Sequence, residues 1–107
     1  MGITNREGIT MNNIICKAIN ARLVLKIYCD GGFRLIEPHC YGISISGDEL
    51  LRSFQISDYN TSYISNEWKL FTVTDIESIV ITEQKFQGPR SSYVRNDSAM
   101  QHIYCQL

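Results

Sequence analysis

The stretch from residue 33 to residue 56 constrains the fold more than any other part of this chain. It reads F-R-L-I-E-P-H-C-Y-G-I-S-I-S-G-D-E-L-L-R-S-F-Q-I and holds two apolar-rich strands, over 33–46 and 49–56, joined by a tight turn. Ser46, Gly47 and Asp48 form that turn, because Gly and Asp tolerate the positive φ that tight turns need. The stretch therefore predicts a β-hairpin.

Two residues of the longer predicted strand are unusual for a regular central strand. Pro38 has no backbone N–H to donate, so it indicates a sheet edge or a β-bulge. Gly42 permits a sharp bend of the kind that small barrels need at their corners. We therefore expect this strand to be kinked near its middle.

The flanking residues predict one short helix and three further strands. An apolar stripe at helical spacing predicts the helix over 12–20. Alternating or continuous apolar residues predict the strands, and a polar loop and a short connector separate them. The expected elements are strands over 23–28, 67–74 and 78–82, a hairpin turn over 30–32, a loop over 57–66 and a connector over 75–77.

The chain breaks again at Gly88 and Pro89, and the remainder reads as a C-terminal tail. Asp97 is a candidate N-cap for a last helical turn or two. The apolar residues after it follow the i, i+3, i+4, i+7 spacing of a helix, which predicts that the tail docks its apolar side on the rest of the fold. These residues are Met100, Ile103, Tyr104 and Leu107.

A chain of 107 residues is expected to form one domain with one small core. A helix followed by five short, hairpin-linked strands predicts a mainly β fold, a small five-stranded SH3-like or Sm-like barrel with a short N-terminal helix and a C-terminal helical tail. An α+β sandwich is the alternative. The expected organisation is a mobile leader over 1–11, the barrel over 12–87 and the docked tail over 88–107.

The net charge of −1 gives no overall attraction to nucleic acid or to anionic membranes, although a local basic patch stays open. No apolar run approaches the roughly 18 residues of a membrane helix, and no signal-peptide h-region is present. We therefore expect a cytoplasmic protein with no membrane partner.

The four cysteines, at positions 16, 29, 40 and 105, form no C-x-x-C spacing of a zinc or redox motif. Without a secretory signal, free buried thiols are expected. If a pair forms, Cys29 and Cys40 are the residues that a hairpin would place opposite each other.

Polar groups concentrate in the central stretch and suggest a ligand site. Arg34, Glu37 and His39 lie beside the kink at Pro38, where a cation, a carboxylate and an imidazole could bind a polar ligand. The alternative is a structural ion pair of Arg34 with a solvated His39. Tyr41 follows on the same strand and completes this part of the candidate site.

The next strand adds Arg52 and Gln55, and Lys69 adds a further cation. Arg52 falls among apolar neighbours, so it must be paired or reach the rim, because an unpaired buried charge is costly. A guanidinium fork suits phosphate or carboxylate. Contact with a ligand and an internal salt bridge are both open for Arg52.

Catalytic and metal motifs are absent from the sequence. Glu67 and Lys69 form an E-x-K pair like half of a metal-dependent nuclease core, which needs further acids. His39 and His102 lack partners at metal-ligand spacing. We therefore expect a protein that is not an enzyme and has neither metal nor cofactor. Five aromatic residues could stack bases, with the loop residues Tyr59 and Tyr63 better exposed than Tyr41, Trp68 and Tyr93.

The order of these features resembles the WYL domain, a small Sm-like or SH3-like barrel. The segments I-I-C-K-A-I, R-L-V-L-K-I-Y, F-R-L-I-E-P-H, E-L-L-R-S-F and W-K-L-F-T-V-T-D-I follow one another as in that family, over about residues 12–86. Glu49, Leu50 and Leu51 stand where the family has Trp-Tyr-Leu, and both arginines of its F-R-L-D-R-I segment are absent here. The matching residues are Ala18, Ile19, Arg22, Tyr28, Arg34, Pro38, Phe71 and Ile76.

WYL domains are bacterial regulatory modules that often bind nucleotides or single-stranded nucleic acid, in transcription regulators and phage-defence systems. The resemblance implies a non-enzymatic module of this kind without a helix-turn-helix, with a nucleotide or single-stranded nucleic acid as ligand. A protein-interaction module, acting on a partner protein or as a homo-oligomer, is the alternative. A minimal nuclease around Glu67 and Lys69 is a third hypothesis.

Overall fold

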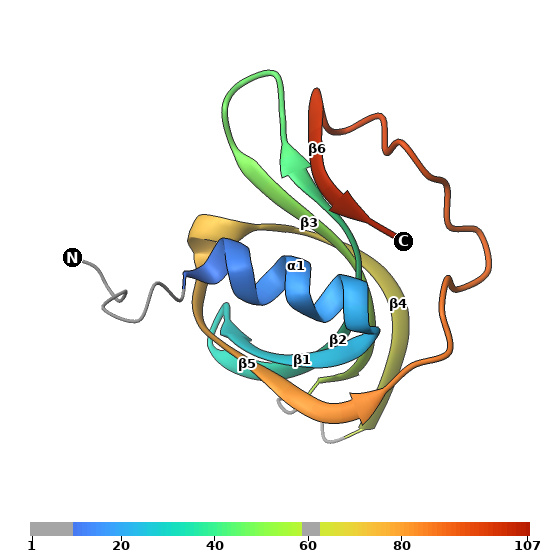
Figure 1. The fold of residues 1–107 in the computed structure, drawn as a ribbon. Coiled ribbons are helices and arrows are strands. Elements are labelled where there is room, and N and C mark those ends of the chain that lie inside the picture. Colours follow the sequence, from blue (N-terminus) through green and yellow to red (C-terminus); the bar gives the residue numbers. More distant parts are fainter. Residues whose placement is uncertain (1–9, 59–62) are drawn as a thin grey trace.

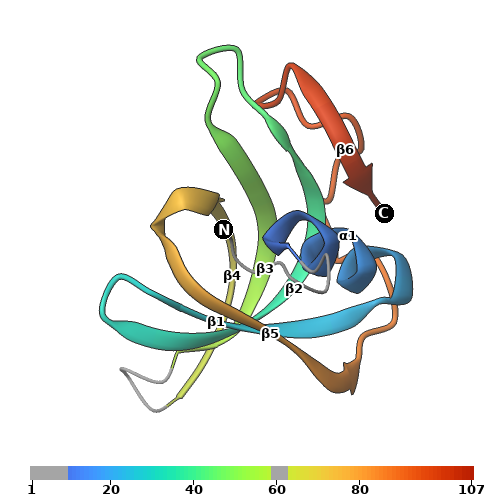
Figure 2. The same ribbon diagram turned by 60° about the vertical axis from the view of Figure 1, so that its left-hand side comes forward.

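The computed structural model describes residues 10–58 and 63–107, with side chains placed except at 63 and 64. Within these ranges, one α-helix packs against one side of a curved six-stranded antiparallel sheet (Figures 1 and 2). The fold is therefore mainly β, as predicted. Most of the expected leader and the side chains of Tyr59 and Tyr63 lie outside the described residues.

The helix α1, Met11–Ala21, begins and ends at recognisable caps. The Thr10 hydroxyl accepts a hydrogen bond from the Asn13 N–H at 3.2 Å, which satisfies one of the free amides of the first turn. Arg22 ends the helix in the left-handed conformation, with φ of 57°. The buried face carries Ile15, Ala18 and Ile19, so the apolar stripe read from the sequence is the face that packs on the sheet.

The six strands form the order β4-β3-β2-β1-β5, and β6 pairs with β2 off this path. A 3-10 turn, η1 (Val73–Asp75), connects β4 to β5. The strands are β1 Leu23–Cys29, β2 Gly32–Ile43, β3 Glu49–Asp58, β4 Tyr63–Thr72, β5 Ile76–Lys85 and β6 His102–Gln106.

Strand β2 is the longest strand and changes partners along its length. Its first half pairs with β1, from Leu25↔Ile36 to Cys29↔Gly32, while its second half pairs with β6. The pairing with β3 shifts register between Pro38 and Cys40, which is the bulge that the proline predicts. Strand β2 therefore pairs with β1 before the bulge and with β6 after it.

Gly42 lies at a register shift of the β2–β6 pairing, and it also allows a close approach of the two strands. A Cβ at this position would collide with the backbone carbonyl of His102 on β6, so only glycine allows the two strands to approach this closely. The close approach fixes where β6 docks on β2.

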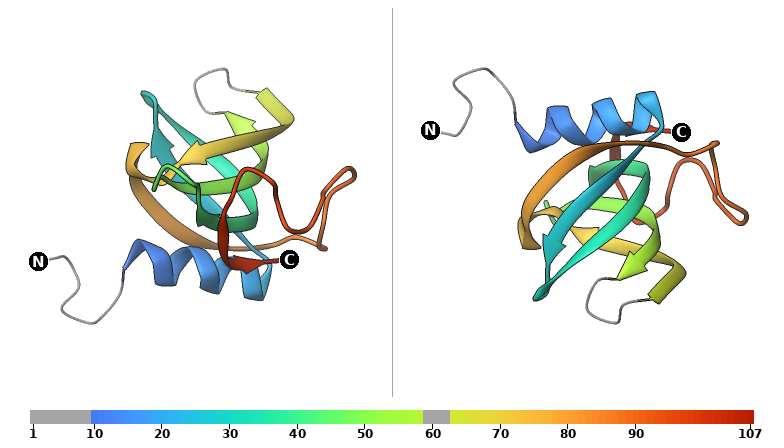
Figure 3. Two further views of the ribbon diagram at one scale, coloured as in Figure 1. Left: turned by 90° about the horizontal axis from the view of Figure 1, so that it is seen from above. Right: turned by 90° about the horizontal axis from the view of Figure 1, so that it is seen from below.

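Two parts of the predicted architecture are wrong. The described sheet is open, since β4 pairs only with β3 and β5 only with β1, so the barrel is not closed. The tail is not helical: residues 102–106 form β6, because β2 offers an unpaired backbone edge after β1 ends. Figures 1 and 3 show the long irregular segment between β5 and β6 running along the outside of the sheet, and α1 against one side of it.

The prediction of free thiols is also wrong for two of the four cysteines. Cys16 of α1 and Cys105 of β6 form a disulfide across 89 residues of sequence, while Cys29 and Cys40 are free and buried. No spacing in the sequence indicates this pair, because only the docking of β6 brings Cys105 to α1. The bond ties the C-terminal strand to the helix that packs on the core.

We expect this disulfide to contribute about 2–5 kcal/mol to the free energy of unfolding, since it closes a long loop. Reductant should therefore lower the melting temperature of the wild type and leave that of a Cys16→Ser/Cys105→Ser variant unchanged. A thiol assay on the denatured, unreduced protein should find two thiols, Cys29 and Cys40. Four reactive thiols would contradict the bond.

Candidate functional site

The structure divides the seven predicted site residues among three environments. Arg34, Gln55 and Lys69 belong to a polar network beside a pocket. Of the other four, Tyr41 packs in the core, and three bond to residues of the C-terminal tail. These three are Glu37, His39 and Arg52.

Arg34 on β2 is buried but only partly satisfied. Its side chain is 10% exposed, and its Nη1 donates to Gln55 Oε1 at 3.1 Å. The carboxylates of Asp30 and Asp58 lie 3.8 and 3.9 Å from its terminal nitrogens, too far for short charge-assisted hydrogen bonds. Its Nε has no hydrogen-bond partner among the described residues. Arg34 is therefore a buried guanidinium with one unused donor, and that donor atom is itself buried.

Gln55 links Arg34 to the polar edge of β4. The Gln55 amide donates to Ser65 Oγ at 2.9 Å, and that hydroxyl donates to Glu67 Oε2 at 2.9 Å. Glu67 in turn lies 3.6 Å from the Lys69 ammonium in an exposed ion pair. Within the described part of the chain, no group of three or more His, Cys, Asp or Glu residues could hold a metal ion.

A pocket of about 710 Å³ opens beside this network, and we call it the Arg34 pocket. Arg34 and Lys69 provide its cations, and the free thiol of Cys29 also lines it. Burial raises the pKa of Cys29 while the nearby Arg34 lowers it, and burial is the larger effect, so the thiol is uncharged at neutral pH. The lining also includes Asp30, whose carboxylate lies 3.8 Å from Arg34 Nη2, and Asp75 and Glu77.

Glu37 anchors the tail, which here means residues 88–107. Both of its carboxylate oxygens accept hydrogen bonds from Arg90, at 2.7 and 2.9 Å, and its side chain is 4% exposed. The Arg90 guanidinium also lies over the Phe54 ring, 4.5 Å from its centroid. A buried carboxylate on a strand therefore finds its cation in the tail.

His39 is fully buried under the same segment. The Arg90 backbone N–H donates to its Nε2 at 3.0 Å, so its Nδ1 carries the proton and donates to the Glu37 carbonyl at 2.8 Å. The rings of Trp68 and Tyr93 contact it edge-on. Burial lowers the pKa of His39, in keeping with a neutral imidazole that accepts a hydrogen bond.

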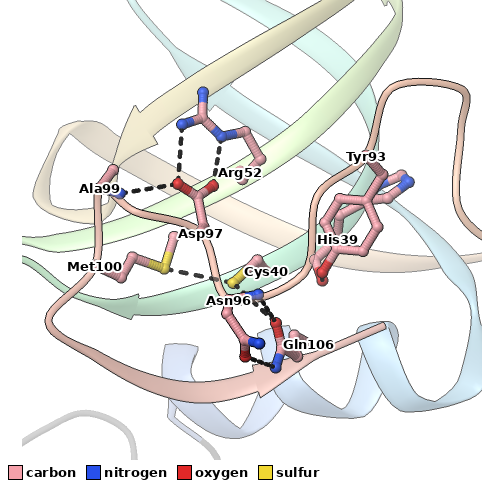
Figure 4. Close-up of polar contacts among 9 residues, drawn as sticks. All are labelled: His39, Cys40, Arg52, Tyr93, Asn96, Asp97, Ala99, Met100 and Gln106. Carbon is pink, nitrogen blue, oxygen red and sulfur yellow. Dashed lines mark hydrogen bonds and ion pairs between the residues drawn. The ribbon is translucent and has the colours of Figure 1, made fainter.

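Arg52 is paired with the tail as well (Figure 4). Its Nε and Nη2 donate to Asp97 at 2.7 and 3.2 Å, and the Ala99 N–H donates to the same carboxylate at 3.0 Å. Hydrogen bonds from Arg52 are the main reason that the pKa of Asp97 is lowered. Of the two interpretations left open for Arg52, the internal salt bridge is the one that the structure contains.

Tyr41 belongs to the core. It is fully buried, and its hydroxyl donates to Glu49 Oε1 at 2.7 Å. Burial is the main cause that raises the pKa of Tyr41 far above its usual range, and the hydrogen bond to Glu49 adds to it. The residue supports the sheet rather than facing a pocket.

The tail therefore covers the part of β2 and β3 that carries Glu37, His39 and Arg52. Sequence reasoning missed Arg90, Tyr93 and Asp97 as their partners. The signal that could have found them is electrostatic, because buried charges on strands need partners, and the tail supplies one cation and one carboxylate for the two unpaired charges.

Comparison of the chain with protein-family models, with curated proteins and with solved structures finds no match. Among the described residues, no helix is long and apolar enough to cross a bilayer.

The lowered pKa of His39 predicts a pH dependence of stability. Above the ordinary value of 6.5, both folded and unfolded states hold a neutral imidazole, so its contribution is constant. Below pH 6.5 the imidazole is protonated in the unfolded chain and still neutral in the folded chain, so the free energy of unfolding falls by up to about 1.4 kcal/mol per pH unit. Below the folded-state pKa of His39 both states are protonated, and the free energy of unfolding no longer changes through this residue. Asp97, whose pKa is also lowered, adds a second loss only below 3.8.

Chemical denaturation at a series of pH values between 8 and 5 measures the loss of stability caused by His39. Its slope should correspond to the uptake of about one proton per molecule on unfolding. His39→Gln should flatten the profile, whereas His102→Gln, at an exposed histidine, should leave it unchanged. A profile that flattens only in the His102 variant would refute the assignment.

Proposed function

We propose that this chain is a WYL-like module that senses a phosphate-bearing ligand, a nucleotide or single-stranded nucleic acid, in the Arg34 pocket. The single observation that carries the proposal is the buried Arg34 guanidinium at a pocket of about 710 Å³, with an Nε that has no hydrogen-bond partner among the described residues. The role is non-enzymatic and belongs to a bacterial regulatory or phage-defence setting, as the resemblance implies.

The arrangement of the chain supports the family part of this proposal. A capped helix precedes five antiparallel strands, and the sheet they form is curved, as in an open version of the SH3-like or Sm-like barrel. Arg34 and Pro38 are the two residues of the R-x-x-x-P segment that carried the resemblance. One of them lines the pocket and the other lies at the β2 bulge.

The energetics of Arg34 favour an anionic ligand. A buried guanidinium is costly unless its hydrogen bonds and its charge are satisfied, and its two acid neighbours lie 3.8–3.9 Å away. A phosphate in the pocket would supply a charge opposite to that of the guanidinium, whose fork geometry suits phosphate. On β3, the hydroxyls of Ser53 and Ser57 also have no partner among the described residues.

The acidic residues that line the pocket restrict which kind of anionic ligand can bind there. Asp75 and Glu77 line the same pocket as Lys69, so a continuous polyanion across it would meet carboxylates. A single phosphate at Arg34 meets fewer carboxylates than a strand does, since the acids nearest to the Arg34 terminal nitrogens are Asp30 and Asp58, at 3.8 and 3.9 Å. We therefore favour a mononucleotide or the phosphorylated end of a single strand over the interior of a strand.

A binding titration with a fluorescent single-stranded oligonucleotide tests the proposal, using a 5′-phosphorylated and a 5′-hydroxyl form. The phosphorylated form should bind more tightly, and salt should weaken it. Arg34→Gln should weaken binding about 10- to 100-fold, because charge-assisted hydrogen bonds contribute about 1.5–3 kcal/mol. Lys69→Gln, at a partly exposed residue, should reduce the salt slope by about 0.7.

Arg22→Gln is the matched control, since Arg22 donates to the Gln87 carbonyl and lines neither the Arg34 pocket nor any other pocket considered below. Each variant is first checked for a cooperative melting transition. Equal loss of binding in the Arg34 and Arg22 variants, or no binding of either oligonucleotide at low salt, would reject this function.

A protein-interaction module is the second candidate, and one observation favours it. The strands β4 and β5 are open edges of the described sheet, and a mainly apolar groove beside β5 is lined by Ile14, Ile79 and Ile81. Open edges can pair with a strand of another molecule. Sedimentation velocity over a range of concentrations would reveal self-association above the 12.3 kDa monomer.

A further inference from the structure

A second cavity, of about 350 Å³, lies where the tail meets β3 and β4. We call it the Trp68 pocket. The sheet contributes two of its lining residues and the tail contributes the others, so the cavity requires the docked tail. Its lining does not overlap with that of the Arg34 pocket. The lining includes Arg52 and Trp68 from the sheet and Tyr93, Val94, Asn96 and Ser98 from the tail.

Two aromatic rings give this pocket flat apolar surface. The planes of Trp68 and Tyr93 lie within 19° of parallel, with centroids 6.1 Å apart. Their polar atoms are already used, because the indole N–H donates to the Ser91 carbonyl at 3.2 Å and the phenol donates to the His39 carbonyl at 3.2 Å. What the two residues can still offer to a ligand is ring surface for stacking.

The pocket carries polar groups but no net charge. Arg52 is neutralised by its two hydrogen bonds to Asp97, which are drawn in Figure 4. The bonds to Asp97 use Nε and Nη2 of Arg52 and not its Nη1, and Ser92 and Ser98 add hydroxyl groups to the lining. A charged ligand would gain no counter-charge here, whereas an uncharged one with donors and acceptors would find partners.

We propose that the Trp68 pocket is a binding site for an uncharged planar nitrogen heterocycle, with a purine base as the representative ligand. The base stacks on the ring surface of Trp68 and Tyr93, and its ring nitrogens and amino group bond to Arg52 and the serine hydroxyls. The volume lies at the lower end of the ~300–1,000 Å³ of small-molecule sites, so it takes a single base or nucleoside rather than a strand.

This site has a consequence for the tail. Because sheet and tail both line the pocket, a ligand bound there stabilises the docked tail over the open one by linkage. It therefore also protects the buried Glu37 and His39 beneath the tail. A ligand in the Trp68 pocket thus increases the fraction of molecules in which the tail covers this face of the sheet.

Trp68 is the only tryptophan of the chain, so its fluorescence reports directly on the pocket. Titration with adenine should quench this fluorescence to saturation, with a dissociation constant that is the same at low and high salt because adenine carries no net charge. Ser98→Phe, at an exposed residue, fills the pocket and should weaken binding by roughly tenfold or more. Gln101→Phe places the same ring on an exposed tail residue outside the pocket and should bind like the wild type.

Arg34→Gln separates this site from the proposed phosphate site, since it should leave adenine binding unchanged whether or not the oligonucleotide binds. Three results would overturn the inference: no saturable quenching up to the solubility limit of adenine, equal binding by the Ser98 and Gln101 variants, or loss of adenine binding in the Arg34 variant. Isothermal titration calorimetry on the same variants provides a readout independent of fluorescence.

Discussion

The second half of β2 requires a backbone partner that β1 does not provide, and much of the structure depends on how this requirement is met. After the bulge at Pro38, β6 takes the place of β1, and the Leu107 N–H donates to the His39 carbonyl at 2.9 Å where the exchange occurs. Buried backbone groups must be paired, so the docking of β6 is a condition of a twelve-residue β2. Gly42 permits the close approach, and the Cys16–Cys105 bond holds the result against α1.

The docking of β6 also draws residues 88–101 across the face of the sheet, and this decides which polar groups stay accessible. Glu37 and Arg52 each receive an oppositely charged partner from that segment, and His39 receives a backbone N–H. Arg34 lies on the other side of the bulge and receives only distant acids. Strand β2 thus carries Glu37 and His39, which the tail pairs, and Arg34, which lines a pocket and has carboxylates only at 3.8–3.9 Å among the described residues.

Some elements of the fold and of the candidate site can be predicted from the sequence, and others cannot. The helix, the hairpin turns, the kink at Pro38 and the mainly β class follow from local spacing and turn chemistry, which act between residues close in sequence. The helical tail was mispredicted because Met100, Ile103 and Tyr104 fit a helical period, while the unpaired edge of β2 lies about 60 residues away in the chain. The Cys16–Cys105 pair and the partners of Glu37 and Arg52 were missed for the same reason. The residue types of the candidate site were identifiable, but their grouping was not.

The sequence by itself determined the periodicity of the strands, the positions of the turns and the polar groups that must be satisfied if buried. These are properties of local backbone preference and of desolvation, which a residue carries into any fold. Only the tertiary structure decided which charged side chains form ion pairs with one another. Arg34 and Arg52 are alike in the sequence, as arginines on neighbouring strands, and they differ because Asp97 comes within 2.7 Å of Arg52 while no carboxylate comes as close to Arg34 among the described residues. That difference arises from contacts between segments far apart in sequence, and these exist only once the tail has docked.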